Sequence, residues 1–300
     1  SDFESFQEGA DYLAQNFGYR PKVLTREELK GEGISGPEFF GGFHLPHGFA
    51  LHPMKYVQRL AEDVRKAGVR IFGRSPVTKL ERERHSWRLH LPEGSLKAKT
   101  VILAGNGYTD ETISPWLRGR TLPVMSSVFV TRPLSDNELA EQGWTSNLMA
   151  ADTRILLHYF RLLPDRRFLF GTRGGIFESP SSLKAMYLRG RADFDRMFPA
   201  WKGVETDYAW YGHVCLARNL TAFVGAVPEM DGVYAAMAWH GSGIAMASHS
   251  GEKVAELALG KLTREDLPAA ITVPLKTFPF PALRNAYLQS AYWLYGWMDR

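Results

Sequence analysis

Residues 231–261 read DGVYAAMAWHGSGIAMASHSGEKVAELALGK, and this stretch decides the fold. Its pattern predicts a buried strand over 233–238, a tight turn over 239–243, a helix over 244–259 and a helix stop at Gly260. Amides at the turn and at the helix start would offer hydrogen-bond donors and a positive dipole end to an anionic group. The alternative is a plain strand-to-helix connection, because glycines are common where helices begin.

One face of the predicted helix carries mostly small side chains, which would let the helix approach a sheet closely. Glycine inside a helix costs about 1 kcal/mol relative to alanine, so we expect close packing at Gly251. The residues of this face are Ile244, Ala247, Ser248, Gly251, Val254, Ala255 and Ala258.

The rest of the chain divides into two patterns. Residues 51–68 predict an amphipathic helix ending at Gly68, VRIFG (69–73) a short strand, and TVILAG (100–105) a central strand of a sheet. From 122 to 214 the runs become longer and typical of an antiparallel sheet, with one helix inserted. The sequence therefore predicts an α/β (α+β) protein with two domains.

Composition limits the function classes. The 300 residues are 45% hydrophobic and 23% charged, with 36 basic and 32 acidic side chains in mixed order and a net charge of +4, so we expect no nucleic-acid groove. Cys215 is the only cysteine, which excludes an internal disulfide and a thiolate zinc cluster. We expect no metal site, no membrane span and no secretory leader, and a reducing compartment such as the cytoplasm.

A second glycine pattern lies near the start of the chain, where Gly31, Gly33 and Gly36 spell G-x-G-x-x-G. A phosphate-binding turn needs a buried strand before its first glycine and a helix after its last. Here a charged helix capped by Thr25 precedes the glycines and Pro37 follows them. The sequence therefore predicts a helix end followed by a loop, and no dinucleotide site.

Two segments, VILAGNGYT (101–109) and the later stretch 231–261, together resemble the FAD-dependent amine and amino-acid oxidases of the D-amino-acid oxidase superfamily. This is the group of glycine oxidase and sarcosine oxidase. Segments 41–81, 158–171 and 210–232 fit the same group in order. The likeness covers nearly the whole chain and is greatest to γ-glutamylputrescine-oxidase-like enzymes.

The resemblance implies an FAD/NAD(P)-binding-type sheet that is incomplete at its N-terminal side, because the family's first strand–turn–helix unit has no counterpart here. It places an FAD-binding domain at 48–119 and 213–266, an antiparallel substrate domain at 1–47 and 120–212, and a helical tail at 267–300. A missing N-terminal segment or a complementary subunit would then be a partner. We expect the chain alone to bind FAD weakly.

The resemblance also implies contacts with FAD, mostly through the backbone. Val77 would meet the adenine, Ala104 and Gly105 would close the sheet against the dinucleotide, and the glycine turn would lie beside the flavin ring. The residues of that turn are Trp239, His240, Gly241, Ser242, Gly243 and Ile244.

Catalytic residues are not identified by the sequence, because the flavin carries the chemistry and a dedicated acid or base is optional. Candidates for the substrate face are His158, Tyr159, Arg161, Arg173 and Trp210, with Tyr211 beside the last. Each has a structural alternative, such as a core histidine, an outward charge or a core aromatic. Cys215 is either a flavin attachment point, as in some sarcosine oxidases, or a buried inert thiol.

We therefore expect an FAD-dependent oxidoreductase that oxidises the C–N bond of a small amine or amino acid to an imine, with oxygen as acceptor. Two alternatives stay open. One is a flavin dehydrogenase that passes electrons to another carrier, and the other is a truncated, non-catalytic subunit that does not bind FAD alone.

Overall fold

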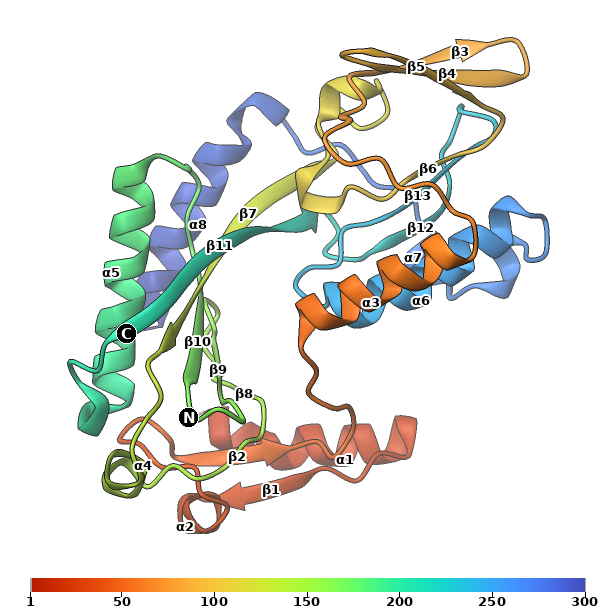
Figure 1. Cartoon of the computed structure of the whole chain (residues 1–300). Coiled ribbons are helices and arrows are strands. Elements are labelled where there is room, and N and C mark those ends of the chain that lie inside the picture. Colours follow the sequence, from red (N-terminus) through yellow and green to blue (C-terminus); the bar gives the residue numbers. More distant parts are fainter. Residues whose placement is uncertain (1, 300) are drawn as a thin grey trace. The chain divides into compact units, whose positions relative to one another are not determined.

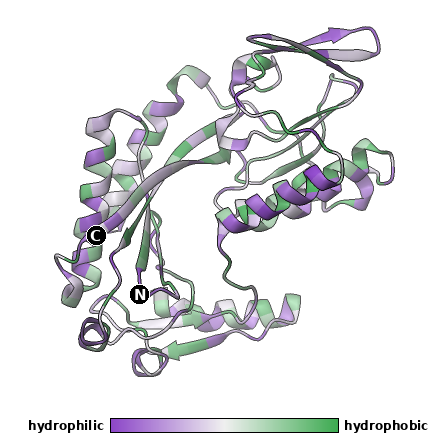
Figure 2. Cartoon of the chain, viewed as in Figure 1, coloured by the Kyte–Doolittle hydropathy of each residue, from purple (hydrophilic) through white to green (hydrophobic). Residues whose placement is uncertain are grey.

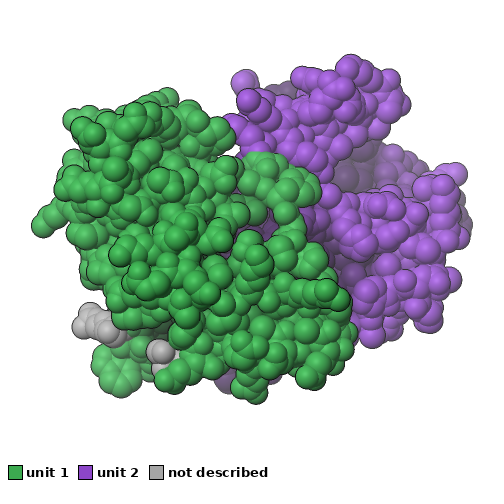
Figure 3. All heavy atoms as spheres, turned by 90° about the horizontal axis from the view of Figure 1, so that it is seen from below, with its two compact units in different colours: residues 1–51, 126–212, 292–300 green, residues 52–125, 213–291 purple. Residues whose placement is uncertain are grey.

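The computed structural model describes residues 2–299, which form two compact units (Figures 1 and 3). Unit 1 contains residues 1–51, 126–212 and 292–300, and unit 2 contains residues 52–125 and 213–291. The expected FAD-binding domain, substrate domain and helical tail remain predictions as functional divisions of the chain.

Unit 1 is built on a five-stranded sheet with the strand order β11-β7-β10-β9-β8. In the order β7, β10, β9 and β8, each strand pairs antiparallel with the next, as the sequence predicts. The strands are β7 (Thr121–Thr131), β8 (Ala150–Ala151), β9 (His158–Leu162), β10 (Phe168–Arg173) and β11 (Thr206–Ala217).

Helix α5 lies against one face of this sheet and closes an aromatic core. Alternation along β9 and β10 turns Phe160, Phe168 and Phe170 to this face, where they meet Phe194 of the helix. Trp144 is fully buried among them. The other elements of the unit are η1 (Asp2–Ser5), α1 (Phe6–Phe17), β1 (Lys22–Thr25), α2 (Arg26–Gly31), β2 (Gly41–His44), α4 (Asp136–Gln142), α5 (Pro180–Met197) and η4 (Pro199–Trp201).

The G-x-G-x-x-G pattern lies in this unit and is a helix end and a loop, as predicted. Thr25 and Glu28 form a capping box that starts α2. Gly33 has a φ of +75°, and its carbonyl accepts hydrogen bonds from the amides of Thr145 and Ser146. The loop is therefore held by backbone contacts to unit 1, and no helix follows it until α3.

Unit 2 contains a three-stranded sheet with the order β12-β13-β6, in which β13 and β6 run parallel. A separate antiparallel sheet has the strand order β3-β4-β5. The strands are β3 (Lys79–Glu83), β4 (Ser86–Leu91), β5 (Gly94–Ala98), β6 (Val101–Leu103), β12 (Phe223–Ala226) and β13 (Val233–Met237).

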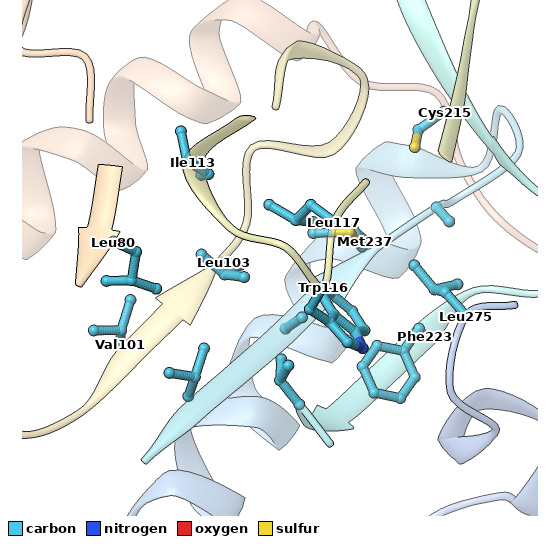
Figure 4. Packing of buried hydrophobic residues seen from close by; sticks show 14 of the residues in the cluster. Leu80, Val101, Leu103, Ile113, Trp116, Leu117, Cys215, Phe223, Met237 and Leu275 are labelled. Carbon is cyan, nitrogen blue, oxygen red and sulfur yellow. The ribbon is translucent and has the colours of Figure 1, made fainter. Parts of the chain in front are cut away.

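The core of unit 2 joins the parallel strands to the loop after β6. Val101, Leu103 and Met237 pack with Trp116, Leu117 and Phe223, and Cys215 lies at the edge of the same cluster (Figure 4). The helical elements of the unit are α3 (Pro53–Lys66), η2 (Asn106–Tyr108), η3 (Glu111–Ile113), α6 (Gly243–Ala258), η5 (Arg264–Asp266), α7 (Ala269–Thr272), η6 (Pro281–Leu283) and the first part of α8 (Arg284–Met298).

Helix α6 follows β13 directly, as predicted, but the expected packing of its small face is wrong. Met246, Val254 and Leu257 face the sheet, whereas the surface around Ile244 is exposed. A Cβ on Gly251 would meet no atom within 4 Å among the described residues. Close packing within this chain therefore does not explain that glycine.

Helix α3 also leaves hydrophobic residues exposed. It begins at His52, whose Nδ1 accepts the amide of Lys55, and its hydrophilic and hydrophobic residues alternate (Figure 2). Its apolar face remains uncovered, with Met54 60%, Val57 55% and Leu60 48% exposed. The following segment VRIFG does not form the expected strand, since a strand exists only where a neighbour pairs with it.

Candidate functional site

The candidate flavin contact lies where two parallel strands of unit 2 end. Ala235 of β13 pairs with Leu103 of β6, so the turn over 238–242 and the residues after Leu103 emerge at the same edge of the sheet. Ligands of open α/β sheets bind outside the carboxyl ends of such strands. The structure therefore brings Ala104 and Gly105 to the same edge as the glycine turn.

The backbone of this turn is strained. Ala238 has a φ of +67° and His240 a φ of +53°, in a region that costs a non-glycine residue about 1–2 kcal/mol. Gly241 follows with a φ of +107°. Strain of this kind persists only where the surroundings hold it, and it gathers at ligand sites.

Asn106 links the two strand ends, and sequence reasoning missed it. Its Oδ1 accepts the amide of Ala238 at 2.9 Å, and its own φ is +48°. The available signal was an asparagine beside glycines directly after a buried strand, because asparagine tolerates left-handed backbone and bonds nearby amides.

The start of α6 presents free donors at this edge. Met246 donates to the carbonyl of Ser242, so the helix itself offers no acceptor to the amides of Gly243, Ile244 and Ala245. Within the described chain Ser242 makes no side-chain cap to them. Gly241, Ser242 and Ile244 are exposed, which leaves this edge open to an anionic or electron-rich group.

Two of the predicted contact residues turn inward. Trp239 is buried in the cluster between α6 and the sheet, and the Nε2 atom of His240 accepts the amide of Ala217 at 3.4 Å. Their side chains therefore hold the turn to the protein. Any contact of these two residues with a ligand would be through the backbone.

Gly105 is constrained by the chain itself. A Cβ at this position would lie 2.5 Å from Oγ1 of Thr109, and that oxygen is buried with no hydrogen-bond partner in the described residues. Val77 is half-buried in the irregular segment before β3. These positions remain predictions as FAD contacts.

The edge described above fits part of FAD. It offers exposed amides, a glycine turn and small residues suited to a flavin ring. The loop at 31–36 is unsuitable for a pyrophosphate, because a helix precedes it and no helix follows it directly. The fit is therefore to the ring end of the cofactor.

In unit 1, the substrate candidates lie on different faces of the sheet. Tyr159, Arg161 and Arg173 belong to the face opposite α5, whereas His158 alternates with them and is buried against Phe170. Thr206 of β11 bonds Tyr187 of α5, and the same alternation puts Trp210 on the α5 face and Tyr211 on the opposite one.

His158 belongs to a closed ring of six charged groups. Its Nδ1 lies 2.6 Å from Asp152 and its Nε2 lies 3.3 Å from Asp193. Asp152 pairs with Arg154, which pairs with Glu38, and Arg196 joins Glu38 back to Asp193. Positive and negative groups alternate around this ring of six residues.

The protonated form of His158 is favoured by this ring. Burial by itself lowers the pKa of His158, but the hydrogen bonds to the two aspartates outweigh it and raise the pKa to about 8. Both ring nitrogens are engaged and the side chain is 5% exposed. This geometry favours the alternative of a core histidine over a role at the substrate.

Tyr159 crosses the sheet on the opposite face. It starts on β9, passes over Gly171 of β10, and its hydroxyl lies 2.9 Å from Oγ of Ser126 on β7. A Cβ on Gly171 would lie 2.1 Å from the tyrosine ring, so only glycine fits there. Glycine within a strand is the signal for such an approach, and sequence reasoning missed it.

Arg173 is close enough to two tyrosines to influence the pKa of each. Burial raises the pKa of Tyr159 and raises that of Tyr292 to about 12, and the charge of Arg173 opposes the shift in both. Arg173 is exposed and pairs with no carboxylate among the described residues. Arg161, by contrast, donates from Nε to the carbonyl of Asn147. Arg173 is therefore the better placed of the two to receive an anion.

Other candidates have structural roles. Cys215 is fully buried, and burial raises the pKa of its thiol to about 12, which favours an inert thiol over a flavin attachment point. No group of three or more metal-binding side chains gathers within residues 2–299. No helix in that range combines the length and apolar character that crossing a bilayer requires.

Comparison with known proteins agrees with the geometry. The chain is 29% identical over 263 residues to the probable oxidoreductase OrdL of Haemophilus influenzae, covering 87% of this chain and 59% of that protein. It is 29% identical over 267 residues to gamma-glutamylputrescine oxidoreductase of Escherichia coli, covering 88% and 59%. The chain thus spans less than two thirds of the length of these relatives.

The fold has a close counterpart in a solved structure. Glycine oxidase from Bacillus cereus superposes with a TM-score of 0.70 at 19% identity, over 91% of this chain and 74% of that one. The family model described as FAD dependent oxidoreductase (DAO) matches residues 1–257. The expected fold class and family resemblance are confirmed, and the chain belongs to the DAO family of FAD dependent oxidoreductases.

Proposed function

We propose that this chain is part of an FAD-dependent oxidoreductase that converts the C–N single bond of a small amine or amino acid to an imine. The observation that carries the proposal is the strained, donor-rich turn at 238–243, at the carboxyl ends of two parallel strands in a chain of this family. When bound, FAD would accept a hydride from the substrate carbon, and water would then hydrolyse the released imine to a carbonyl compound and an amine.

The residues of this chain would hold and polarise the flavin ring. Amides of Gly243, Ile244 and Ala245 would donate toward the side of the ring where negative charge develops during reduction. Asn106 and His240 would keep that turn in its strained form, since each bonds a backbone amide beside it. No side chain needs to transfer a proton if the substrate amine enters neutral.

We propose Arg173 as the anchor of a substrate carboxylate. Its guanidinium has no carboxylate partner in residues 2–299, and a planar guanidinium binds a carboxylate through two parallel hydrogen bonds. Tyr159 would line the same surface, held at its hydroxyl by Ser126. An acidic or zwitterionic amine is therefore the proposed substrate class.

Substitution of the two arginines tests the anchor. Arg173→Met should raise KM for amines that carry a carboxylate roughly tenfold or more and leave neutral amines unchanged. Arg161→Met is the matched control, because that side chain is already bonded to a carbonyl. Equal effects of the two substitutions would place the anchor elsewhere.

Oxygen is the proposed acceptor, with hydrogen peroxide as the reduced product. A flavin dehydrogenase is the alternative. Mixing the reduced protein with air-saturated buffer separates them, because an oxidase regains its oxidised flavin spectrum within seconds and a dehydrogenase does so only with an added carrier. A single buried cysteine is compatible with a reducing compartment, and we propose the cytoplasm.

We also propose that polypeptide outside these 300 residues completes unit 2. Strand β6 is at the edge of its sheet with Ile102 41% exposed, and Phe72 of the unpaired VRIFG segment is 67% exposed. Open edges and apolar faces of this kind normally receive a strand or helix. The relatives contain further chain that could supply one, either in the same polypeptide or in a second subunit.

Flavin titration tests this completion. The 300-residue chain, mixed with FAD and desalted, should retain little flavin absorbance, because ring contacts alone must offset the cost of ordering a flexible dinucleotide. Addition of the segment that matches the remaining length of the relatives should restore it. Stoichiometric flavin in the chain alone would contradict the proposal, and colour without turnover after addition would favour a non-catalytic subunit.

A further inference from the structure

The last two turns of α8 hold two loops of unit 1. Asp299 directly follows the helix, and its carboxylate accepts the amides of Ile155 at 2.9 Å and Leu156 at 2.8 Å. Its own amide donates to the carbonyl of Tyr295, so its backbone continues the helix. Two charge-assisted bonds to consecutive amides fix the loop between β8 and β9.

Tyr292 lies beside the second loop, which follows β10. Burial raises the pKa of Tyr292 to about 12, and the backbone of Gly175 opposes that rise through a hydrogen bond to the tyrosine oxygen. That loop contains Gly174 and Gly175 with φ of +120° and +150°, so its own backbone is permissive. Seven residues separate Tyr292 from Asp299, which places both on one face of the helix.

The two loops lie at the same end of the sheet. His158 of β9 pairs with Thr172 of β10, so the loop entering β9 and the loop leaving β10 are neighbours. The next residue on each strand is Tyr159 or Arg173, the two groups of the open face. A single helix face therefore contacts both loops beside the proposed carboxylate anchor.

The charge ring fixes the first loop from its other side. Asp152 and Arg154 belong to the loop and to the ring, and they tie it to Glu38 and α5. The entry to β9 is thus fixed at Asp152, at Arg154 and at the amides of 155–156. The exit from β10 has one such tie, at Gly175, and so depends more on α8.

We propose that the last two turns of α8 act as a clasp that positions Arg173 and Tyr159, with Asp299 and Tyr292 as its positioning residues. The inference rests on the proposed role of Arg173. The clasp sets the separation of the two loops, and hence the gap into which a carboxylate must fit. Loosening it should weaken carboxylate recognition without removing the guanidinium.

The experiment compares Asp299→Asn and Tyr292→Phe with wild type, using acetate as the probe. Amide hydrogen exchange at 153–157 and 174–176 reports each loop, and chemical shifts of the Gly174 and Gly175 amides report acetate binding. Asp299→Asn should speed exchange at 153–157 roughly tenfold and Tyr292→Phe at 174–176 by a smaller factor. Both should weaken acetate binding several-fold.

Glu252→Gln on the surface of α6 is the matched control, since Glu252 is exposed and pairs only with Lys253 among the described residues. Circular dichroism establishes that each variant is folded, and Asp299→Glu should recover part of the exchange protection. Unchanged exchange in Asp299→Asn overturns the clasp. Faster exchange with unchanged acetate binding overturns its positioning role.

Arg173→Met separates this inference from the proposed function. If that variant binds acetate as tightly as wild type, the anchor assignment is wrong. Hydrogen exchange then decides the clasp alone, where protection at 155–156 that survives Asp299→Asn overturns it.

Discussion

The cores of the two units are built differently, although both units expose large apolar side chains, such as Trp297 in unit 1 and Phe72 in unit 2. In unit 1 the aromatic side chains of β9, β10 and α5 fill one core, and the buried charges close into a ring. In unit 2 helix α3 leaves its apolar face in solvent and β6 leaves an edge unpaired. Among the described residues, unit 1 therefore has one aromatic core beside a ring of charged groups, whereas unit 2 leaves one helix face and one strand edge without a partner.

The largest expected effect is in the core of unit 1. Trp144 is fully buried and its Nε1 donates to the carbonyl of Ser146, so Trp144→Ala should lower the free energy of unfolding by about 3–5 kcal/mol. Urea denaturation followed by circular dichroism measures this. A loss below about 1 kcal/mol would mean that unit 1 also lacks part of its core.

The charge ring should make unit 1 sensitive to mildly alkaline pH. The pKa of His158 rises from 6.5 to about 8 on folding, so its contribution is fully present below pH 6.5 and is lost as pH rises through 8. A shift of this size corresponds to about 2 kcal/mol. Urea midpoints between pH 6 and 9 measure it, and His158→Gln should abolish the dependence. An equal pH dependence in His158→Gln would assign the titration to another group.

Relief of backbone strain in unit 2 should raise the free energy of unfolding, by less than the losses expected above. Ala238→Gly removes the cost of a φ of +67° and should stabilise the unit by about 1 kcal/mol. Thermal unfolding measures this in the 300-residue chain. Loss of flavin retention in the completed protein would show that the strain serves binding, and an unchanged melting temperature would argue against strain at Ala238.

The smallest effect is expected on α3. Leu60 is 48% exposed, so Leu60→Lys should change the stability of this chain by less than about 0.5 kcal/mol. The same substitution should weaken association with the segment proposed to complete unit 2. A large loss of stability in the chain alone would show that α3 is already packed, and would remove the contrast between the units.

The sequence predicted the elements whose signals are local. Thr25 caps α2 as expected, and the strand, turn and helix at 233–259 lie within a residue of expectation. These features depend on neighbours in the chain. The antiparallel pattern of unit 1 was predicted for the same reason, since alternation along each strand marks its two faces.

The candidate site was predicted in part. Glycine spacing identified the turn at 239–243, but not the strained Ala238 or its bond to Asn106, which joins residues 132 positions apart. From the sequence, His158 and Tyr159 were equal candidates because they are neighbours in one strand. The structure distinguishes them, since His158 lies on the α5 face in the charge ring and Tyr159 lies on the opposite face with Arg173.

The amino-acid sequence alone therefore determined the periodic elements and the exclusion of the first glycine pattern, because each depends on residues within about ten positions. It also determined the family likeness, because the order of motifs along the chain can be read without tertiary contacts. Only the tertiary structure decided which faces are covered. Amphipathic spacing at Met54 and Val57 specifies an apolar face, but burial needs a partner surface, and in the described chain that face has none. The tertiary structure also places Asp299 against the loop before β9. Asp299 and Ile155 are 144 positions apart, so no local pattern encodes this contact.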